Sequence, residues 1–330
     1  MEEIRVGTIG SGPIVHAVLD GVKVMEGIRC AAVYSRTKET ARKLAAEYGV
    51  SKTYTDMEKF LSDKEINVVY IATPNLLHYE QTKGALLAGK HVICEKPFCT
   101  RADQAEELIN LAKKKKLFLV EAAPTTFLPN FSVLKEAVSA IGRIRLVQGS
   151  YCQYSSRYDN LLQGEVPNIF NPELAGGCLM DINFYNAYLN VALFGKPEQV
   201  VYYPNFYKDT KIDTSGLLVM QYEDFVSENV GAKDTWGVNS FQIQGEEGYV
   251  YVEGGSNSFQ SVRIVTRQSD ETLNLQENVD RRIYEVRELT RLFLADAYDE
   301  IYKRLEITLD TVCVIESARK AAGLIFPGDA

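Results

Sequence analysis

The spacing of hydrophobic residues changes about one third of the way along the chain. Over the first 120 or so residues, short apolar runs alternate with stretches of helical pattern. The apolar runs predict strands at 4–10, 28–35, 67–73, 91–97 and 117–123. The stretches between them predict helices at 13–25, 37–49, 77–90 and 101–116. Strands that alternate with helices of this length indicate βαβ units, a parallel sheet and right-handed crossovers.

After Ala123 the pattern becomes that of a different architecture. Runs with a period of two predict strands at 145–155, 198–207, 214–224, 238–255 and 261–267. Helices are predicted at 129–142, 280–302 and 308–323. Runs with this period, separated by turns, favour an antiparallel sheet. With no low-complexity linker in between, we expect an α/β protein with one domain over 1–122 and a second over 123–330.

Composition narrows the class of protein. The chain has 330 residues, 46% of them hydrophobic and 24% charged, and a net charge of −8 with a pI of about 5.2. An acidic chain lacks the basic face of a nucleic-acid-binding protein. No apolar run approaches the length of about 18 residues that a membrane helix needs, and the N-terminus does not resemble a secretory signal. We therefore expect a cytoplasmic protein without nucleic-acid or membrane partners.

Cysteine and histidine usage argues against a metal site. The six cysteines are scattered and form no CxxC pair, which is typical of buried thiols in a reducing compartment. The three histidines, His16, His78 and His91, form no metal-binding signature. We therefore predict no metal, and any general acid beyond position 91 must be something other than histidine.

The first strand is followed directly by a glycine-rich turn, Gly10-x-Gly12, and Pro13 suits the first turn of the next helix. In such a loop one glycine permits the tight turn and the other lets the backbone approach a pyrophosphate at the helix N-terminus. Val15 occupies the third glycine position, so the fingerprint is incomplete. The βαβ context nevertheless predicts dinucleotide binding through Gly10, Gly12, Pro13 and Ile14.

The end of the second strand bears on the choice of cofactor. A carboxylate there would bind the ribose 2′-hydroxyl of NAD. This chain instead has Ser35 and Arg36, followed by Thr37 and Lys38. A hydroxyl beside a guanidinium suits a 2′-phosphate, so we predict NADP. The alternative is that Arg36 is a solvated turn residue and that NAD binds as well.

The fourth strand ends in Glu95-Lys96-Pro97. A buried ammonium is costly unless it is paired. Either the strand exits into water at Lys96, or the lysine is held at a site. Ligands of open α/β sheets bind at the carboxyl ends of the strands, which favours a site.

A second cluster follows the glycine pair Gly176-Gly177, which permits a tight entry into a helix that starts near Cys178. On that helix Asp181 and Tyr185 are four residues apart and share a face. They could carry an acid and a phenol toward a cleft. The alternative is a core helix with a capping aspartate and a half-buried tyrosine.

Three segments together resemble the glucose–fructose oxidoreductase / inositol dehydrogenase (Gfo/Idh/MocA) family. They are the Gly10-x-Gly12 loop, "ATPNLLH" with "GKHVICEKP" at 72–78 and 89–97, and "AGGCLMDINFYNAYLNVALFG" at 175–195. The resemblance covers nearly the whole chain. It implies an N-terminal Rossmann domain and a C-terminal α/β domain whose open, mostly antiparallel sheet forms a subunit interface. It also implies a cis bond between Lys96 and Pro97.

The resemblance suggests how the chemistry is divided. Lys96 matches the family's lysine, and Tyr185 falls where many members have histidine. A cation can stabilise charge on a carbonyl oxygen, and a cation within about 4–6 Å of a phenol favours the phenolate. We therefore expect Lys96 to stabilise charge, Tyr185 to carry the proton, and Asp181 to orient a substrate hydroxyl or the lysine.

Other candidates line the two ligands. Residues expected along the edge of the cofactor are Glu95, Thr73, Pro74, Asn75 and His78, the last being equally interpretable as a packed histidine. The segment 151–177 is rich in Tyr, Asn and Arg and is the predicted substrate wall, with Tyr154 and Arg157 as candidates. Such a segment would equally suit a solvated loop.

These observations predict an NADP-dependent oxidoreductase of a sugar, polyol or trans-dihydrodiol. Two alternatives stay open: a catalytically idle dinucleotide-binding regulator, and a reductase of another substrate class such as an imine or a tetrapyrrole. We also expect a homodimer or larger homo-oligomer through the C-terminal sheet, because one sheet face is too apolar to stay bare. The residues expected on that face are Val200, Tyr202, Leu217, Val219, Phe241, Ile243, Tyr249 and Tyr251.

Overall fold

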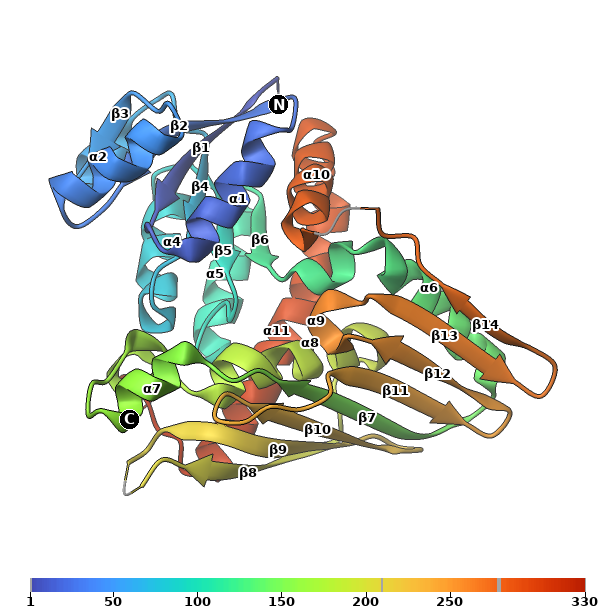
Figure 1. Cartoon of the computed structure of the whole chain (residues 1–330). Coiled ribbons are helices and arrows are strands. Elements are labelled where there is room, and N and C mark those ends of the chain that lie inside the picture. Colours follow the sequence, from blue (N-terminus) through green and yellow to red (C-terminus); the bar gives the residue numbers. More distant parts are fainter. Residues whose placement is uncertain (1, 209, 278–279, 330) are drawn as a thin grey trace. The chain divides into compact units, whose positions relative to one another are not determined.

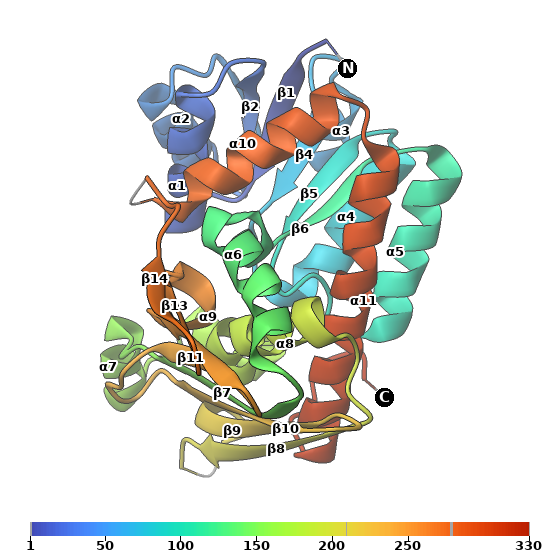
Figure 2. The same cartoon turned by 90° about the vertical axis from the view of Figure 1, so that its right-hand side faces the viewer.

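The computed structural model describes residues 2–208, 210–277 and 280–329, drawn in Figures 1 and 2. The chain forms two compact units. The first comprises residues 1–123 and 280–309, and the second comprises residues 124–279 and 310–330. The segment 280–309 thus returns to the N-terminal unit, whereas the division drawn from the sequence placed it in the second domain.

A six-stranded sheet forms the centre of the first unit, and all its strand pairs are parallel. Its order is β3 (Lys52–Tyr54), β2 (Ile28–Tyr34), β1 (Ile4–Ile9), β4 (Val68–Ile71), β5 (His91–Glu95) and β6 (Leu119–Ala122). The five predicted strands are confirmed. β3 was missed because three half-buried residues carry no hydrophobic period.

Helices cover both faces of this sheet. They are α1 (Pro13–Lys23), α2 (Lys38–Glu47), α3 (Met57–Ser62), α4 (His78–Leu87), α5 (Ala102–Lys115) and α10 (Arg281–Leu294), with the short helix η1 (Asn75–Leu77). Strand order reverses between β1 and β4, so right-handed crossovers put α1 and α4 on opposite faces. α10 packs alongside α1 and against β1 (Figures 1 and 2).

The two last helices differ from the prediction in where they separate. α10 ends at Leu294 and α11 (Tyr298–Ala321) begins after three intervening residues, whereas the sequence suggested a break between 302 and 308. Asp296 adopts a left-handed φ of 50°, which ends α10 there. The described helices include none long and apolar enough to cross a membrane.

An eight-stranded sheet forms the centre of the second unit, with one parallel pair, β7 with β10, among antiparallel neighbours. Its order is β14 (Asp270–Leu273), β13 (Ser261–Thr266), β12 (Gly248–Glu253), β11 (Ser240–Gly245), β7 (Ile144–Cys152), β10 (Val226–Ala232), β9 (Asp213–Gln221) and β8 (Gln199–Phe206). The predicted, mostly antiparallel sheet is confirmed. The sequence did not separate β10 from its surroundings.

Most helices of the second unit are short. They are η2 (Pro124–Phe127), α6 (Pro129–Ala137), η3 (Val138–Ile141), α7 (Ser156–Leu162), η4 (Asn168–Phe170), η5 (Pro172–Leu174), the π-helical turn η6 (Leu179–Asn183), α8 (Phe184–Phe194) and α9 (Gly255–Ser258). α6, α8 and α9 pack on the sheet. The segment 151–177, the predicted substrate wall, contains the helix α7.

One face of this sheet is covered and the other is open. Leu218, Met220, Val250 and Val252 are buried, while their neighbours along the same strands are partly exposed. The predicted list of open-face residues mixed the two faces. Val200, Tyr202, Phe241 and Ile243 lie on the covered face, and Leu217, Val219, Tyr249 and Tyr251 on the open face. Strand register decides this, because a shift of one residue moves a side chain to the other face.

Candidate functional site

The glycine loop after β1 has the geometry that a phosphate needs. Gly10 has φ +124°, and a Cβ at this position would overlap the carbonyl of Ala72. Gly12 is the N-cap of α1 in extended conformation, and an added Cβ there would meet nothing within 4 Å. Val15, in place of the third glycine, is fully buried. The loop therefore leaves the helix N-terminus approachable by an anion.

At the end of β2, Ser35 is buried and its backbone N–H donates to the Tyr54 carbonyl at 3.1 Å. Arg36 is exposed, and Thr37 caps α2 by accepting from the Thr40 N–H at 3.3 Å. Hydrogen bonds of the neighbouring residues Ser35 and Thr37 thus fix the backbone on either side of Arg36. An exposed guanidinium here is consistent with both interpretations of the sequence, a residue that binds a 2′-phosphate and a solvated turn residue.

The turn after β4 is tied to the turn after β5. Thr73 donates its hydroxyl to Gln81 at 2.7 Å, and Pro74 and Asn75 lead into η1. His78 is fully buried, with its ring nitrogens 2.9 Å from the carbonyl oxygens of Thr73 and Pro97. Burial lowers the pKa of His78. Because both ring nitrogens engage the protein, we interpret His78 as a support for the two turns.

Lys96 follows the last residue of β5, and its bond to Pro97 is cis, as the resemblance implied. Glu95 before it is buried and accepts a hydrogen bond from the Tyr70 hydroxyl at 2.7 Å. Arg282 of α10 lies 3.5 Å from the same carboxylate and 2.7 Å from Glu285. Glu95 is therefore held by protein groups and fixes the strand end from which Lys96 starts.

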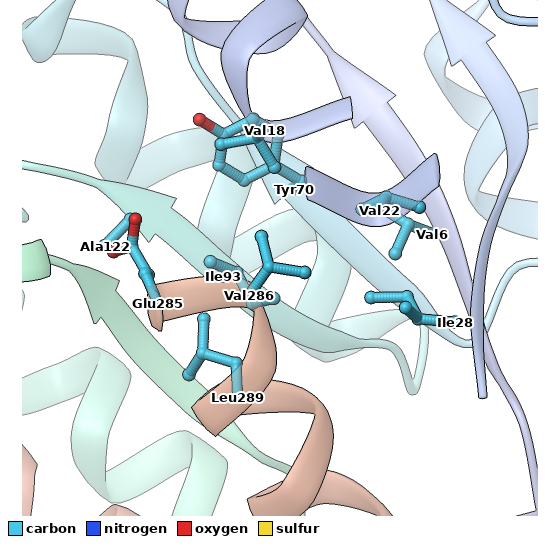
Figure 3. Close-up of a pocket in the computed structure, with 10 residues that line it drawn as sticks. All are labelled: Val6, Val18, Val22, Ile28, Tyr70, Ile93, Ala122, Glu285, Val286 and Leu289. Carbon is cyan, nitrogen blue, oxygen red and sulfur yellow. The ribbon is translucent and has the colours of Figure 1, made fainter. Parts of the chain in front are cut away.

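A small cavity lies beside this charged cluster, between the sheet, α1 and α10 (Figure 3). It is about 20 Å³, room for one water molecule. Its lining is mostly aliphatic, and Tyr70 and Glu285 supply polar side chains. One oxygen of Glu285 is buried without a hydrogen-bond partner. A cavity of this size is a gap in core packing and does not suit a cofactor or a sugar.

Sequence reasoning missed Glu121, at the end of β6. One carboxylate oxygen accepts from the Phe98 N–H at 2.9 Å, two residues beyond Lys96. The side chain is buried, and this burial raises the pKa of Glu121 to about 8. Its only signal in the sequence is an acid inside an apolar run, "LFLVEAA". The carboxyl group braces the turn that carries Lys96.

In the second unit, Gly177 provides the entry to the helix with Asp181 and Tyr185. It has φ +121°, and a Cβ there would overlap the Asp213 carboxylate. Asp213 accepts from the Leu179 N–H and from the Tyr202 hydroxyl, both at 2.7 Å. A distant strand thus supplies the cap for this helix. The helical path starts at Cys178 as predicted, but its first turns are π-helical, a form frequent at functional sites.

Tyr185 is buried in aromatic surroundings. Its ring meets Tyr151 edge-on at 5.7 Å between centroids and Phe184 at 5.8 Å. The Tyr151 hydroxyl accepts from Asn257 and donates to Gln153 at 3.1 Å. The phenol is therefore placed by packing, and its position follows that of α8.

Buried asparagines hold α8 on the sheet. Asn183 donates to the Asn229 carbonyl at 3.0 Å, and Asn190 donates to the Asn229 side chain at 2.9 Å. Asn186, next to Tyr185, donates to Asn183 at 3.0 Å and to the Val230 carbonyl at 3.1 Å. Each of these amides donates to a defined acceptor, so together they specify one position of α8 on the sheet.

Asp181 pairs with Lys233, which sequence reasoning missed. The lysine side chain is 4% exposed and the aspartate side chain 27%. Lys233 directly follows β10, and nothing in its sequence neighbourhood marks it as buried. The predicted site residue thus has a cationic partner inside its own unit.

The predicted wall residues lie on and before α7. Tyr154 donates to Asp159 at 2.6 Å and stacks on Trp236, with ring centroids 5.7 Å apart and planes 9° apart. Trp236, the single tryptophan of the chain, is 79% exposed. Arg157 is exposed in the first turn of α7. Of the two, Tyr154 is part of an aromatic surface that Trp236 completes.

Comparison with known proteins identifies the family to which the chain is similar. Residues 4–122 match the model of an oxidoreductase family with an NAD-binding Rossmann fold, and residues 131–251 match the GFO/IDH/MocA C-terminal domain. The chain is 35% identical over 330 residues to scyllo-inositol 2-dehydrogenase (NADP(+)) IolU of Bacillus subtilis, covering 99% of each chain. It is 30% identical to trans-1,2-dihydrobenzene-1,2-diol dehydrogenase of Xenopus tropicalis over 58% of this chain and 56% of the relative.

Among solved structures, the 3-ketoreductase KijD10 of Actinomadura kijaniata, in complex with NADP and TDP-benzene, has the same fold. The TM-score is 0.85 at 22% identity, covering 96% of this chain and 97% of the other. The family models together span most of the chain, and the full-length relative spans nearly all of it. The chain therefore belongs to the Gfo/Idh/MocA family of oxidoreductases.

Proposed function

We propose that this protein is an NADP-dependent oxidoreductase that transfers a hydride between the nicotinamide and a sugar, polyol or trans-dihydrodiol. The observation that carries the proposal is the full-length similarity to a relative named as an NADP-dependent scyllo-inositol 2-dehydrogenase. The partial relative named as a trans-dihydrobenzenediol dehydrogenase supports the same class of secondary alcohols on a ring.

The residues present suit this cofactor. The loop of Gly10 and Gly12, continued by Pro13 and Ile14 of α1, would hold the pyrophosphate. Ser35 and Arg36 would bind the 2′-phosphate. The residues that would lie along the cofactor's other edge are Thr73, Pro74, Asn75, Glu95 and Lys96, with His78 behind them. Bound there, the cofactor supplies or accepts the hydride.

The protein's own groups would manage charge and proton. Lys96 stabilises negative charge on the substrate oxygen. Tyr185 takes the hydroxyl proton when the alcohol is oxidised and returns it when the carbonyl is reduced. Asp181 accepts a hydrogen bond from a substrate hydroxyl. The three are the proposed catalytic residues.

Substrate contacts and assembly extend the proposal. Tyr154 and Arg157 are proposed substrate-wall residues, and the aromatic pair with Trp236 supports the former. We assign dinucleotide binding to residues 1–122 and substrate binding to 123–330. The open, partly apolar sheet face supports a homodimer or larger homo-oligomer. Six free cysteines support a reducing, cytoplasmic location.

The alternatives receive less support. The two relatives reported above are named as dehydrogenases, which supports an enzyme over a catalytically idle regulator. A tetrapyrrole reductase, the biliverdin reductase of Synechocystis sp. PCC 6803, shares the fold with a TM-score of 0.80, but at 19% identity this likeness supports the fold alone. Nothing reported above favours an imine reductase.

The test is a panel of cyclic polyols, aldoses and trans-diols, each offered with NADP and with NAD, while absorbance of the reduced nicotinamide is followed. We expect turnover of at least one cyclic polyol or sugar with NADP. Absence of turnover across the panel, in both directions, would overturn the proposal.

A further inference from the structure

Lys233 is a buried lysine that pairs with Asp181, a proposed catalytic residue, and the proposed chemistry gives this lysine no role. Lys233 has a fixed backbone, because its N–H donates to the Thr214 carbonyl at 2.8 Å and its carbonyl accepts from the Ser155 N–H at 2.9 Å. The point from which its side chain starts is therefore fixed. It is 3% exposed overall, and a lysine this buried needs a partner.

Two groups receive the ammonium. One is the Asp181 carboxylate, with which it forms an ion pair. The other is the ring of Phe170, whose centroid lies 5.6 Å from Nζ. Phe170 is fully buried and belongs to a small apolar cluster with Leu161 and Ile212. The lysine thus joins the helix of Asp181 to the wall segment at η4.

The pair is asymmetric in its access to solvent. The lysine end is 4% exposed and the carboxylate end 27%, so the accessible end of the pair is the acceptor. A carboxylate backed by a buried cation stays ionised and keeps one orientation. An ionised, oriented acceptor recognises a hydroxyl donor on a ligand.

We propose that Lys233 is a positioning residue that holds Asp181 as the acceptor for a second substrate hydroxyl, next to the reacting carbon. The inference rests on the proposed function and names the substrate feature that Asp181 recognises, a hydroxyl on the carbon next to the reacting one, together with the residue that positions this acceptor. A site built to bind a substrate hydroxyl discriminates strongly against the analogue that lacks it, because its own polar group is then left unpaired.

The experiment compares trans-cyclohexane-1,2-diol with cyclohexanol, two ligands that differ by one hydroxyl. Binding of each to the NADPH-saturated protein, which cannot oxidise an alcohol, is measured by calorimetry, and oxidation of each with NADP is measured as kcat and KM. We expect the native protein to favour the diol by roughly 10- to 150-fold, the size of one charged hydrogen bond. Lys233→Met should reduce this preference to about threefold or less, while NADP affinity stays within about twofold.

Matched variants separate positioning from stability. Lys233→Arg keeps the charge and should retain most of the preference. Asp181→Asn should lose it as Lys233→Met does, and the double variant should be no worse. Lys90 is the control, a second buried lysine, which donates to the carbonyls of Asp63 and Ile66 at 2.8 Å. Lys90→Met should lower the melting temperature and leave the preference unchanged.

Each outcome decides something. If the native protein binds the diol no better than cyclohexanol, or if Lys233→Met keeps the preference, the inference is overturned. If Lys233→Met does not fold, Lys233→Gln, judged against Lys233→Arg, supplies the same comparison. Diol-selective binding without turnover of any alcohol would overturn the proposed function and leave the role of Lys233 standing.

Discussion

At the scale of single residues, the proposed site combines exposed groups that could meet a ligand with buried groups that place them. Arg36 is exposed on a braced turn, whereas Glu95 and Glu121 are buried and hold the strand ends around Lys96. Tyr185 is positioned by aromatic packing. Substitutions should therefore separate into those that affect binding, those that affect turnover and those that affect stability.

Arg36 should decide the choice between cofactors. Arg36→Ala removes one charge-assisted contact to the 2′-phosphate, worth about 1.5–3 kcal/mol. We expect NADP binding to weaken accordingly and NAD binding to change little, as measured by titration of both cofactors. Lys43→Ala, an exposed cation on the same helix α2, is the control. Equal affinity of the native protein for NADP and NAD would contradict the assignment.

Lys96 and Tyr185 should behave as one unit in turnover. Lys96→Met and Tyr185→Phe should each lower kcat by roughly 10²–10⁴, the usual size of a general acid–base contribution. The double variant should cost little more, because groups that act on one proton are not additive. Cofactor affinity should fall far less than kcat. Full activity of Tyr185→Phe would remove the proton-carrier role from this residue.

Glu121 should make stability fall as pH rises. Burial raises its pKa from 4.5 to about 8, so between these pH values the folded protein holds a proton that the unfolded chain has released. The free energy of unfolding then decreases with pH across this window, by on the order of a few kcal/mol. Glu121→Gln keeps an acceptor for the Phe98 N–H and should flatten the decrease. Urea unfolding at pH 5.5 and 8.5 measures this.

Exposed Glu106 on α5 supplies the control for that experiment. Glu106→Gln should leave the dependence of unfolding free energy on pH as it is in the native protein. If Glu121→Gln and the native protein lost stability equally between the two pH values, Glu121 would not be the proton-binding group.

At the scale of elements, the helix of Asp181 and Tyr185 depends on contacts from outside itself. Asp213 of β9 caps its start, and Asn229 of β10 accepts hydrogen bonds from Asn183 and Asn190. Leu179 and its capping residue Asp213 are 34 positions apart, so this helix takes its observed geometry only together with the sheet. Changes in the sheet should therefore affect the positions of the proposed catalytic residues Asp181 and Tyr185.

Asp213 tests this dependence. Asp213→Ala removes the acceptor of the buried Leu179 N–H and leaves the Tyr202 hydroxyl only the Ser215 carbonyl, 3.5 Å away, at about 1–3 kcal/mol for each lost hydrogen bond. We expect a loss of roughly 2–5 kcal/mol in the free energy of unfolding, measured with urea, and a smaller loss for Asp213→Asn. A loss below about 0.5 kcal/mol in Asp213→Ala would show that the cap is dispensable.

At the scale of the whole molecule, the open sheet face remains to be covered. Tyr203, Leu217 and Val230 are aligned across β8, β9 and β10, and Val201 pairs with Val219 one step along. Tyr203 is 60% exposed and Val201 43%. Apolar residues that adjoin across three strands are typical of an interface between copies.

We expect a dimer or larger closed oligomer at micromolar concentration, measured by light scattering. Leu217→Glu would place a charge in the middle of the apolar residues and should shift the protein toward the monomer. Lys135→Glu on α6, exposed elsewhere in the second unit, should not. A monomeric native protein would rule out this use of the face.

By itself the sequence determined the class of fold, because periodicity is local. Alternating strands and helices up to Ala123, and period-two runs after it, correspond to the parallel and the mostly antiparallel sheet. The sequence also identified three candidate sites, each next to a local signal. The signals are the glycine turn at Gly10, the charged strand end at Lys96, and the glycine pair before the helix of Asp181 and Tyr185. Boundaries were less certain where a single residue such as Asp296 ends a helix.

Only the tertiary structure decided which buried charges support the site. Lys233 contacts Asp181, 52 residues away, and Asp213 contacts Leu179, 34 residues away. Arg282 contacts Glu95, 187 residues away, and Glu121 braces the turn of Lys96, 25 residues away. No local pattern links such pairs, because a charged residue in the sequence looks the same whether it faces water or a counter-charge. The sheet faces were decided in the same way, since register between strands, and not the alternation within each, sets which side is covered.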